Sequence, residues 1–222
     1  MCGDGVVDGD EECDDGNASN TDACTDACMH AVCGDGYIWS GIEECDDGNT
    51  QGGDECDASC QSEARHVFVT DETYNGALGG LAGADQKCQA SASAANLPGS
   101  YYAWVSASDG SPSSRFSRST VPYRLPDGTI VADSWADLTD GTLSHAIDRT
   151  ASGALVGGTT VWTGTNAQGA PTGTNCLDWT SDNSIQSGGR TGDAATTGVT
   201  WTDNSNNGCA AFASVRLYCF EQ

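Results

Sequence analysis

The clearest alternation of hydrophobic and polar positions lies at the end of the chain. There Val215, Leu217 and Cys219 fall on one side of an extended segment, with polar and aromatic residues between them on the other side. A polar turn over residues 203–208 would join this strand to an earlier one that ends near Thr202. The pattern therefore predicts a terminal β-hairpin.

A helical period appears once, over residues 78–96. Small apolar residues recur there at helical spacing: Leu81, Ala84, Cys88 and Ala92. The sequence Asn-Leu-Pro-Gly over 96–99 favours a helix end at that point. Residues 66–70 and 101–106 have the composition of strands.

The remainder, residues 107–200, is rich in Ser, Thr and Gly, with short apolar islands. The islands span residues 129–132, 134–138, 160–163 and 176–180. One strong helix among several short strands and long loops predicts an α+β domain over residues 66–222. Five of the six Trp residues lie in this domain, and we expect most of them in its core, with one exposed ring for sugar stacking as an alternative.

The first 62 residues show no such periodicity and instead form a repeat. Cys2-Gly-Asp-Gly5 returns as Cys33-Gly-Asp-Gly36, and Glu11-Glu-Cys-Asp-Asp-Gly-Asn17 returns at 43–49. The copies span residues 2–30 and 33–60, and residues 61–65 form a polar connector. Neither copy has enough apolar side chains to bury a core, so covalent links and bound metal are expected to order it.

Cysteine usage separates the two parts of the chain. Eight of the twelve cysteines precede residue 61 and four follow it. Their spacing does not match the paired Cys-x-x-Cys of zinc ribbons, so we interpret them as disulfides formed in an oxidising compartment. Each copy holds four cysteines, which allow three pairings: Cys2, Cys13, Cys24 and Cys28 in the first, and Cys33, Cys45, Cys56 and Cys60 in the second.

The net charge of −24 is unevenly distributed. Residues 1–62 hold 17 acidic residues and no Lys or Arg, whereas residues 63–222 carry a net charge of −7. Such a surface excludes nucleic acid and heparin-like polyanions as partners and favours divalent cations.

Acidic and amide side chains recur at equivalent positions of the two copies beside a turn glycine, which is the chemistry that Ca²⁺ prefers. The candidate calcium ligands are Asp4, Asp14, Asp15, Asn17 and Asp22 in the first copy, and Asp35, Asp46, Asp47, Asn49 and Asp54 in the second. The alternative is an acidic, solvated spacer held by disulfides. The EF-hand template does not fit, because its Glu at loop position 12 has no counterpart.

The repeat resembles a known family. Its CGDG…EECDDGN…D-x-C-x3-C pattern is similar to the cysteine-rich repeat of bacterial, notably myxobacterial, surface proteins, and to the calcium-binding Notch-type repeats of pappalysin-like proteins. The resemblance covers residues 2–60 and implies a calcium-stabilised, disulfide-bonded extracellular module without catalysis of its own.

The second domain resembles endostatin, and more closely the endostatin-like, C-type-lectin-fold domain of bacterial surface lipoproteins. The order of parts carries the resemblance: a helix with Cys, Tyr-x-Ala-Trp-Val-Ser, Val-Trp-Thr-Gly-Thr, Asn-Cys-x-x-Trp-Thr and a terminal Arg-Leu-Tyr-Cys. It implies the disulfides Cys88–Cys219 and Cys176–Cys209. The zinc-binding His cluster and the basic heparin-binding face of endostatin have no match in this sequence.

Sugar-binding C-type lectins carry a Glu-Pro-Asn or Gln-Pro-Asp triplet that is missing between residues 166 and 175. Trp201-Thr-Asp-Asn204 resembles their ligand strand with its order shifted, so Asp203 and Asn204 are a second candidate metal site; a plain polar turn explains the stretch equally well. The candidate ligand-binding residues are Asn166, Asn175, Asp178, Trp179 and Asp203, in loops around 163–175 and 181–208.

Three functions remain open at this point. The leading hypothesis is a recognition or adhesion module, secreted or on the bacterial outer surface, that binds a glycan or a cell-surface or matrix protein. The alternative is a structural surface or matrix protein whose repeats mediate assembly. A glycan hydrolase that uses an acid pair from Asp137, Asp140, Asp178 and Asp203 is a weaker hypothesis, and we expect no enzyme. The sequence has no transmembrane run, and a lipid anchor upstream of it is compatible with this interpretation.

Overall fold

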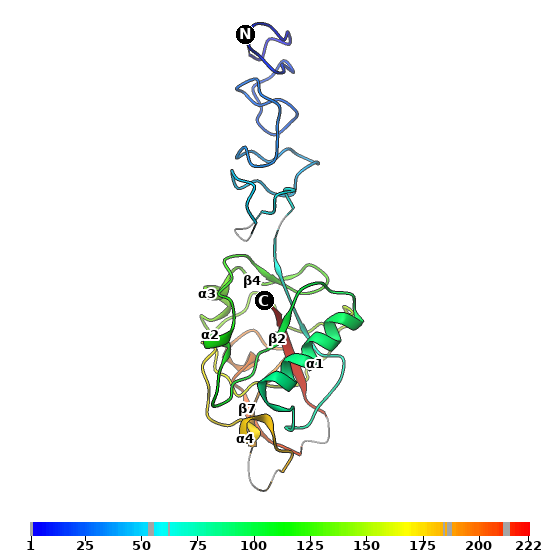
Figure 1. Ribbon diagram of the computed structural model, residues 1–222, viewed down its shortest axis with the longest axis vertical. Helices are drawn as coiled ribbons and strands as arrows, with labels where there is room; N and C mark the ends of the chain where they lie inside the picture. The colour runs from blue at the N-terminus through cyan, green and yellow to red at the C-terminus, as the bar shows by residue number, and fades with distance from the viewer. Residues whose placement is uncertain (1, 53–55, 62, 184, 186–187, 211–213) are drawn as a thin grey trace. The chain divides into compact units, whose positions relative to one another are not determined.

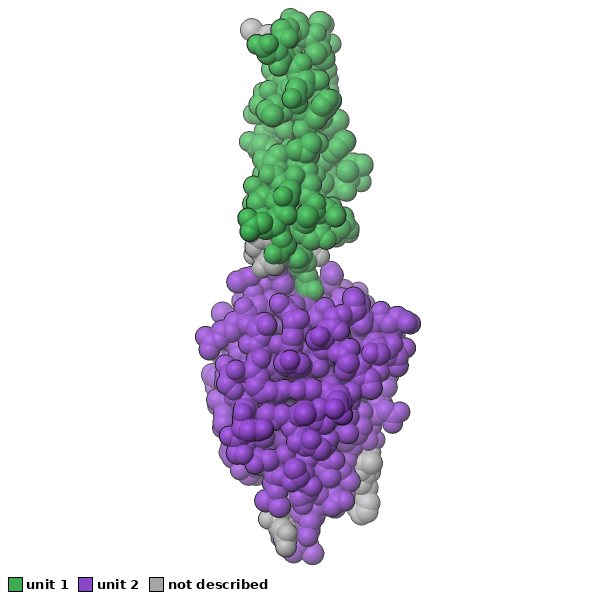
Figure 2. Space-filling view, in the orientation of Figure 1, with its two compact units in different colours: residues 1–64 green, residues 65–222 purple. Residues whose placement is uncertain are grey.

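The computed structural model describes residues 2–52, 56–61, 63–183, 185, 188–210 and 214–222. The chain forms two compact units, residues 1–64 and residues 65–222, which are coloured separately in Figure 2.

Unit 2, residues 65–222, is built on an eight-stranded mixed sheet (Figure 1). Its strands are β1 (Arg65–Val69), β2 (Tyr101–Ala103), β3 (Tyr123–Arg124), β4 (Ile130–Ala132), β5 (Thr160–Trp162), β6 (Gly188–Asp193), β7 (Ser205–Gly208) and β8 (Arg216–Glu221). Their order is β4-β3-β1-β8-β5-β6-β7, and β2 also pairs with β8. The unit is thus a mixed, sheet-rich α+β structure with few helices.

One long helix and several single turns accompany the sheet. They are α1 (Gly80–Ala94), α2 (Pro112–Arg115), α3 (Trp135–Leu138), α4 (Cys176–Trp179) and a 3₁₀ turn (Val199–Trp201). The predicted helix is confirmed, and its buried side includes the four predicted residues. Its end is also as expected, because Asn96 has the left-handed φ of 59° that terminates helices.

Strand β8 organises the unit because it pairs with three others: antiparallel with β1 and β2, and parallel with β5. The predicted alternation is confirmed. Leu217 and Cys219 enter the hydrophobic cluster that lies under α1, whereas Tyr218 and Phe220 enter a second cluster on the other face of the sheet. All five Trp residues of the unit are buried, so the alternative of an exposed ring for sugar stacking is wrong for them.

The predicted terminal hairpin is wrong. The segment before Thr202 is the 3₁₀ turn, and residues 205–208 form β7, which pairs with β6 rather than with β8. Strand β6 was not predicted, because its sequence Gly-Gly-Arg-Thr-Gly-Asp has low strand propensity. Packing explains the glycines: a Cβ on Gly189 would lie 2.7 Å from the Trp162 ring, and one on Gly192 would lie 1.9 Å from the Trp201 carbonyl oxygen.

Unit 1, residues 1–64, has no helix or strand among its described residues. Two disulfides close each copy, the first cysteine pairing with the fourth and the second with the third. They are Cys2–Cys28 and Cys13–Cys24, then Cys33–Cys60 and Cys45–Cys56. The structure therefore selects one of the three pairings left open by the sequence, and it selects the same one in both copies.

Candidate functional site

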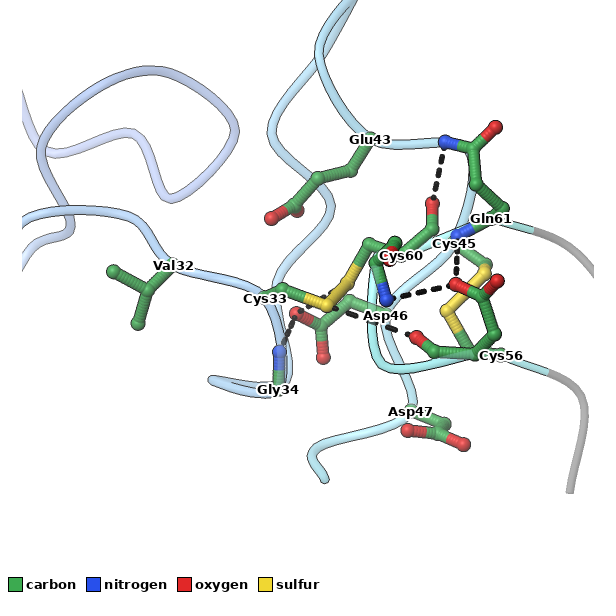
Figure 3. The surroundings of a disulfide bond; sticks show 12 residues. Val32, Cys33, Gly34, Glu43, Cys45, Asp46, Asp47, Cys56, Cys60 and Gln61 are labelled. Carbon is green, nitrogen blue, oxygen red and sulfur yellow. Dashed lines mark hydrogen bonds between the residues drawn. A yellow bond between two sulfur atoms is a disulfide. The ribbon is translucent and has the colours of Figure 1, made fainter. Parts of the chain in front are cut away.

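One carboxylate organises each repeat by accepting hydrogen bonds from four backbone amides. In the first copy, Asp14 accepts from the amides of Gly3, Asp4, Gly5 and Gly16 at 2.8–3.2 Å. In the second, Asp46 accepts from the amides of Gly34, Asp35, Gly36 and Gly48 at 2.7–3.2 Å. Figure 3 shows the Asp46 carboxylate beside the Cys33–Cys60 disulfide, turned toward the Gly34 amide.

These bonds lower the pKa of both carboxyls. Desolvation acts in the opposite direction and is the largest single effect, but the four amide donors together outweigh it, so the pKa values of Asp14 and Asp46 lie below the ordinary value. Each carboxylate oxygen already accepts two hydrogen bonds. Asp14 and Asp46 therefore hold the loop together, and a cation bound to either would compete with its amide donors.

The other candidate calcium ligands also shape their own loops. Backbone amides donate to the side chains of Asp4, Asp35, Asp15, Asp47, Asn17 and Asn49. Asp22 differs: its Oδ2 accepts from Asn17 Nδ2 at 3.1 Å, but its Oδ1 is buried and has no hydrogen-bond partner within the described structure. A bound cation would satisfy that oxygen. The equivalent residue of the second copy, Asp54, lies outside the described residues.

Two clusters of potential metal ligands occur among the described residues, both in unit 1. One contains Glu11, Asp14 and Cys28, and the other contains Glu43, Cys33 and Cys60. The cysteines are disulfide-bonded, so no thiolate is available and only carboxylate oxygens remain. Oxygen ligands suit a hard cation such as Ca²⁺ and not a thiolate-bound metal.

In unit 2, the segment that the sequence marks as a ligand loop is a left-handed turn. The four residues of α4 have φ values from 51° to 61°, a conformation that costs a non-glycine residue about 1–2 kcal/mol. Asp178 braces it: the carboxylate accepts from the Ser108 amide at 2.8 Å, the Ser108 hydroxyl at 2.6 Å and Asn175 Nδ2 at 2.7 Å. The Ser108 bonds lower the pKa of Asp178.

The ligand-binding role predicted for Trp179 is wrong. Its side chain is completely buried, and its indole N–H donates to the Ser106 carbonyl at 2.8 Å, so the ring presents no face to a ligand. Asn175 is half-buried, and its Oδ1 accepts from the Asp178 amide within the same turn. The structure brings Asn175, Asp178 and Trp179 together, but as the support of a strained turn.

The remaining predicted ligands are occupied in similar ways. Asn166 Oδ1 accepts from the amides of Gln168 and Ala170, which closes its loop. Asp203 forms an ion pair with Arg190 Nε, and a cation beside this guanidinium would be repelled. Asn204 is exposed next to it.

The acid pair considered for hydrolysis also serves local structure. Asp137 Oδ2 accepts from the Asp133 amide at 2.9 Å, and Asp140 Oδ1 accepts from the Thr142 amide at 2.8 Å. With Asp178 and Asp203 engaged as described above, none of the four carboxylates presents two free oxygens to a substrate.

A cavity of about 420 Å³ that the sequence pattern does not predict lies beside α1. It is lined by Asp71, Glu72, Tyr74, Lys87 and four small residues of the second half of the helix and its end, together with Ser152. One signal pointed to it: Lys87 is the single lysine of the whole chain and follows a helix face of small residues.

Comparison with known proteins identifies a family and a partial relative. A family model described as a protein of unknown function (DUF1554) matches residues 71–197, more than half of the chain. The acetylcholinesterase collagenic tail peptide of Torpedo marmorata is 57% identical over 44 residues, which are 19% of this chain and 9% of the relative. The chain therefore spans less than a tenth of that relative's length.

Two further properties bear on where the chain acts. Its six disulfides fit an extracellular protein. In the described parts of the chain, every helix is too short or too polar to cross a lipid bilayer. From the match over residues 71–197, the chain belongs to the DUF1554 family, whose function is unknown.

Proposed function

We propose that the chain is a calcium-stabilised recognition or adhesion module, secreted or held on the bacterial outer surface. Unit 2 would be its C-type-lectin-like head and would bind a glycan or a surface protein. Two disulfides, Cys88–Cys219 and Cys176–Cys209, support this assignment, since they are the pairs that the resemblance implies. Unit 1 would be the myxobacterial-type repeat region. Calcium binding there is supported by Asp22 Oδ1, which is buried and has no hydrogen-bond partner among the described residues.

The observation that carries the recognition role is the surface formed by β7 and the α4 turn, which lie close together in Figure 1. Strand β7 is an edge strand of the sheet, and its Ser205 and Asn206 are exposed. Asn206 accepts a hydrogen bond from Thr174 at 3.3 Å, just before the turn, and Leu177 at the turn is 55% exposed. Amides and hydroxyls both donate and accept, as recognition of sugar hydroxyls requires.

A glycan array and a pull-down of surface proteins with the full chain, in calcium and in EDTA, test this proposal. We expect Asn206→Ala to weaken capture, whereas Gln86→Ala, which removes an exposed amide from α1, should not. Capture of no glycan and no protein under either condition would refute a recognition function.

A second candidate, assembly through the repeats, is favoured by one specific observation. Val6 and Val7 follow the first Cys-Gly-Asp-Gly and are 59% and 56% exposed; Tyr37 and Ile38 follow the second and are 44% and 46% exposed. The matched relative is named as a tail peptide of an enzyme, which suits a non-catalytic role in assembly. Sedimentation velocity over a wide concentration range tests this candidate. We expect the chain to associate as its concentration rises, and we expect Tyr37→Ser and Ile38→Ser to reduce that association.

A further inference from the structure

The cavity beside α1 is separate from the surface proposed above for recognition. Its volume of about 420 Å³ lies between the segment that follows β1 and the second half of the helix. Ligand pockets in proteins begin at roughly 300 Å³, so the space suits a small organic molecule.

Charges of both signs line this cavity and have no ion-pair partner among the described residues. Asp71 and Glu72 are exposed, and among the described residues the only side-chain contact of either carboxylate is a 3.3 Å hydrogen bond that the Ser152 hydroxyl donates to Asp71. Lys87 also lines the cavity, and its ammonium lies 5.1 Å from the centroid of the Tyr74 ring. Within the described residues, no carboxylate forms a salt bridge with Lys87.

The wall that carries the two acids is fixed by the core of the unit. The Tyr74 amide donates to the Val215 carbonyl at 2.7 Å, and the Tyr74 carbonyl accepts from Trp162 Nε1 at 3.2 Å. Arg216 donates to the Asp71 carbonyl, and the Thr70 hydroxyl donates to the Glu72 carbonyl at 2.9 Å. Because this backbone is already ordered, a ligand would bind without a large entropic cost for arranging it.

The floor of the cavity, on the helix side, contributes apolar surface and the negative end of the helix dipole. Three alanines, Ala90, Ala94 and Ala95, contribute methyl groups to it, and Ser91 lies among them. The last turn of α1 has no basic residue, so the negative end of the helix dipole is not compensated locally. The cavity is therefore negative near Asp71, Glu72 and the helix end, and positive at Lys87.

We propose that this cavity binds a small zwitterion of the amino-acid type, its ammonium at Asp71 and Glu72 and its carboxylate at Lys87. An aliphatic side chain would rest on the alanine floor. A simple cation would leave the Lys87 charge unmatched and repelled, and a neutral sugar would leave all three charges without a counter-charge. A zwitterion complements both signs of charge that line the cavity.

The single lysine gives a direct assay on the full chain. Reductive ¹³C-methylation keeps the positive charge of Lys87 and gives one side-chain NMR signal. The signal is assigned to Lys87 by its absence from the spectrum of the Lys87→Arg variant. We expect free leucine or dialanine to shift this signal saturably. N-acetylalanine amide, ethylammonium and propionate, which lack one or both charges, should bind at least about tenfold more weakly, since one lost charge-assisted hydrogen bond has that size. Comparing leucine with dialanine distinguishes a free amino acid from a peptide.

Calorimetry with the unlabelled chain compares the affinity of variants for the zwitterion. The double change Asp71→Asn and Glu72→Gln should weaken zwitterion binding by at least about tenfold, whereas Asp109→Asn, an exposed acid outside the cavity, should leave it unchanged. Equal binding of leucine and N-acetylalanine amide, or no binding of either zwitterion at millimolar concentration, would overturn the proposal. Capture of glycans or proteins through β7 would be unaffected by that result.

Discussion

The two disulfides of unit 2 should contribute unequally to its stability. Cys88–Cys219 joins residues 131 positions apart, whereas Cys176–Cys209 joins residues 33 apart. In the loop-entropy model these closures stabilise the folded state by about 5 and about 3.7 kcal/mol, respectively. All four cysteines are completely buried, so the double variants C88A/C219A and C176A/C209A remove the same atoms from equally buried positions. The difference between them therefore isolates loop length.

Denaturant unfolding followed by Trp fluorescence measures this difference, because five of the six Trp residues are buried in unit 2. We expect C88A/C219A to lose about 1 kcal/mol more unfolding free energy than C176A/C209A. Since a domain of this size is stable by only about 5–15 kcal/mol, the first variant should be close to unfolding. Equal losses, or a larger loss for C176A/C209A, would refute the reasoning from chain closure.

Three further predictions concern single residues. Asp46→Asn should lower the melting temperature of unit 1 in calorimetry, because an amide oxygen replaces half of a carboxylate that accepts four backbone amides. Leu177→Gly should raise the unfolding free energy of unit 2 by roughly 0.5–1 kcal/mol in denaturant, since Leu177 is exposed and glycine adopts its φ of 53° without strain. Glu221 should make unit 2 less stable in acid. Desolvation raises the pKa of Glu221, but the hydrogen bonds from His66 lower it by more, so the folded pKa lies below the unfolded value of 4.5. The contribution of Glu221 to stability is therefore complete above pH 4.5 and is lost as pH falls through the folded pKa, which melting curves measured against pH will show.

Matched variants decide each of these cases. Asp47→Asn, at an acid with one backbone hydrogen bond, should change melting less than Asp46→Asn, and the reverse order would contradict the anchoring role. Ala82→Gly, on the exposed side of α1, should destabilise by about 1 kcal/mol, the opposite sign to Leu177→Gly. Glu221→Gln should flatten the acid limb of the melting profile; an unchanged limb would show that Glu221 does not cause it.

Elements with strong periodicity could be predicted from the sequence. The helical spacing of Leu81, Ala84, Cys88 and Ala92 and the alternation along β8 each reflect one buried side, so the pattern alone shows which residues face the core. The acidic repeat was equally visible in the sequence. The anchoring of Asp14 on four amides was not, because it depends on how the loop folds around that side chain.

Features that arise from distant segments could not be predicted. Strand β6 requires glycines where Trp162 and Trp201 lie against its backbone, and no local sequence pattern predicts these contacts. The left-handed α4 turn is held at Asp178 by Ser108, which is far away in the sequence. The sequence did not show that Trp179 is buried, or that the side chains of Asn175 and Asp178 form hydrogen bonds within their own turn. The cavity combines residues from three segments and has no motif.

We propose that disulfides and bound calcium order unit 1 in place of a hydrophobic core. Amide hydrogen exchange of the oxidised full chain, followed over residues 2–61 in calcium and in EDTA, tests it directly. We predict slower exchange in calcium throughout the repeats, and loss of that protection in the first copy when Asp22→Asn removes the charge of the partnerless carboxylate. Identical exchange in calcium and in EDTA would contradict the claim.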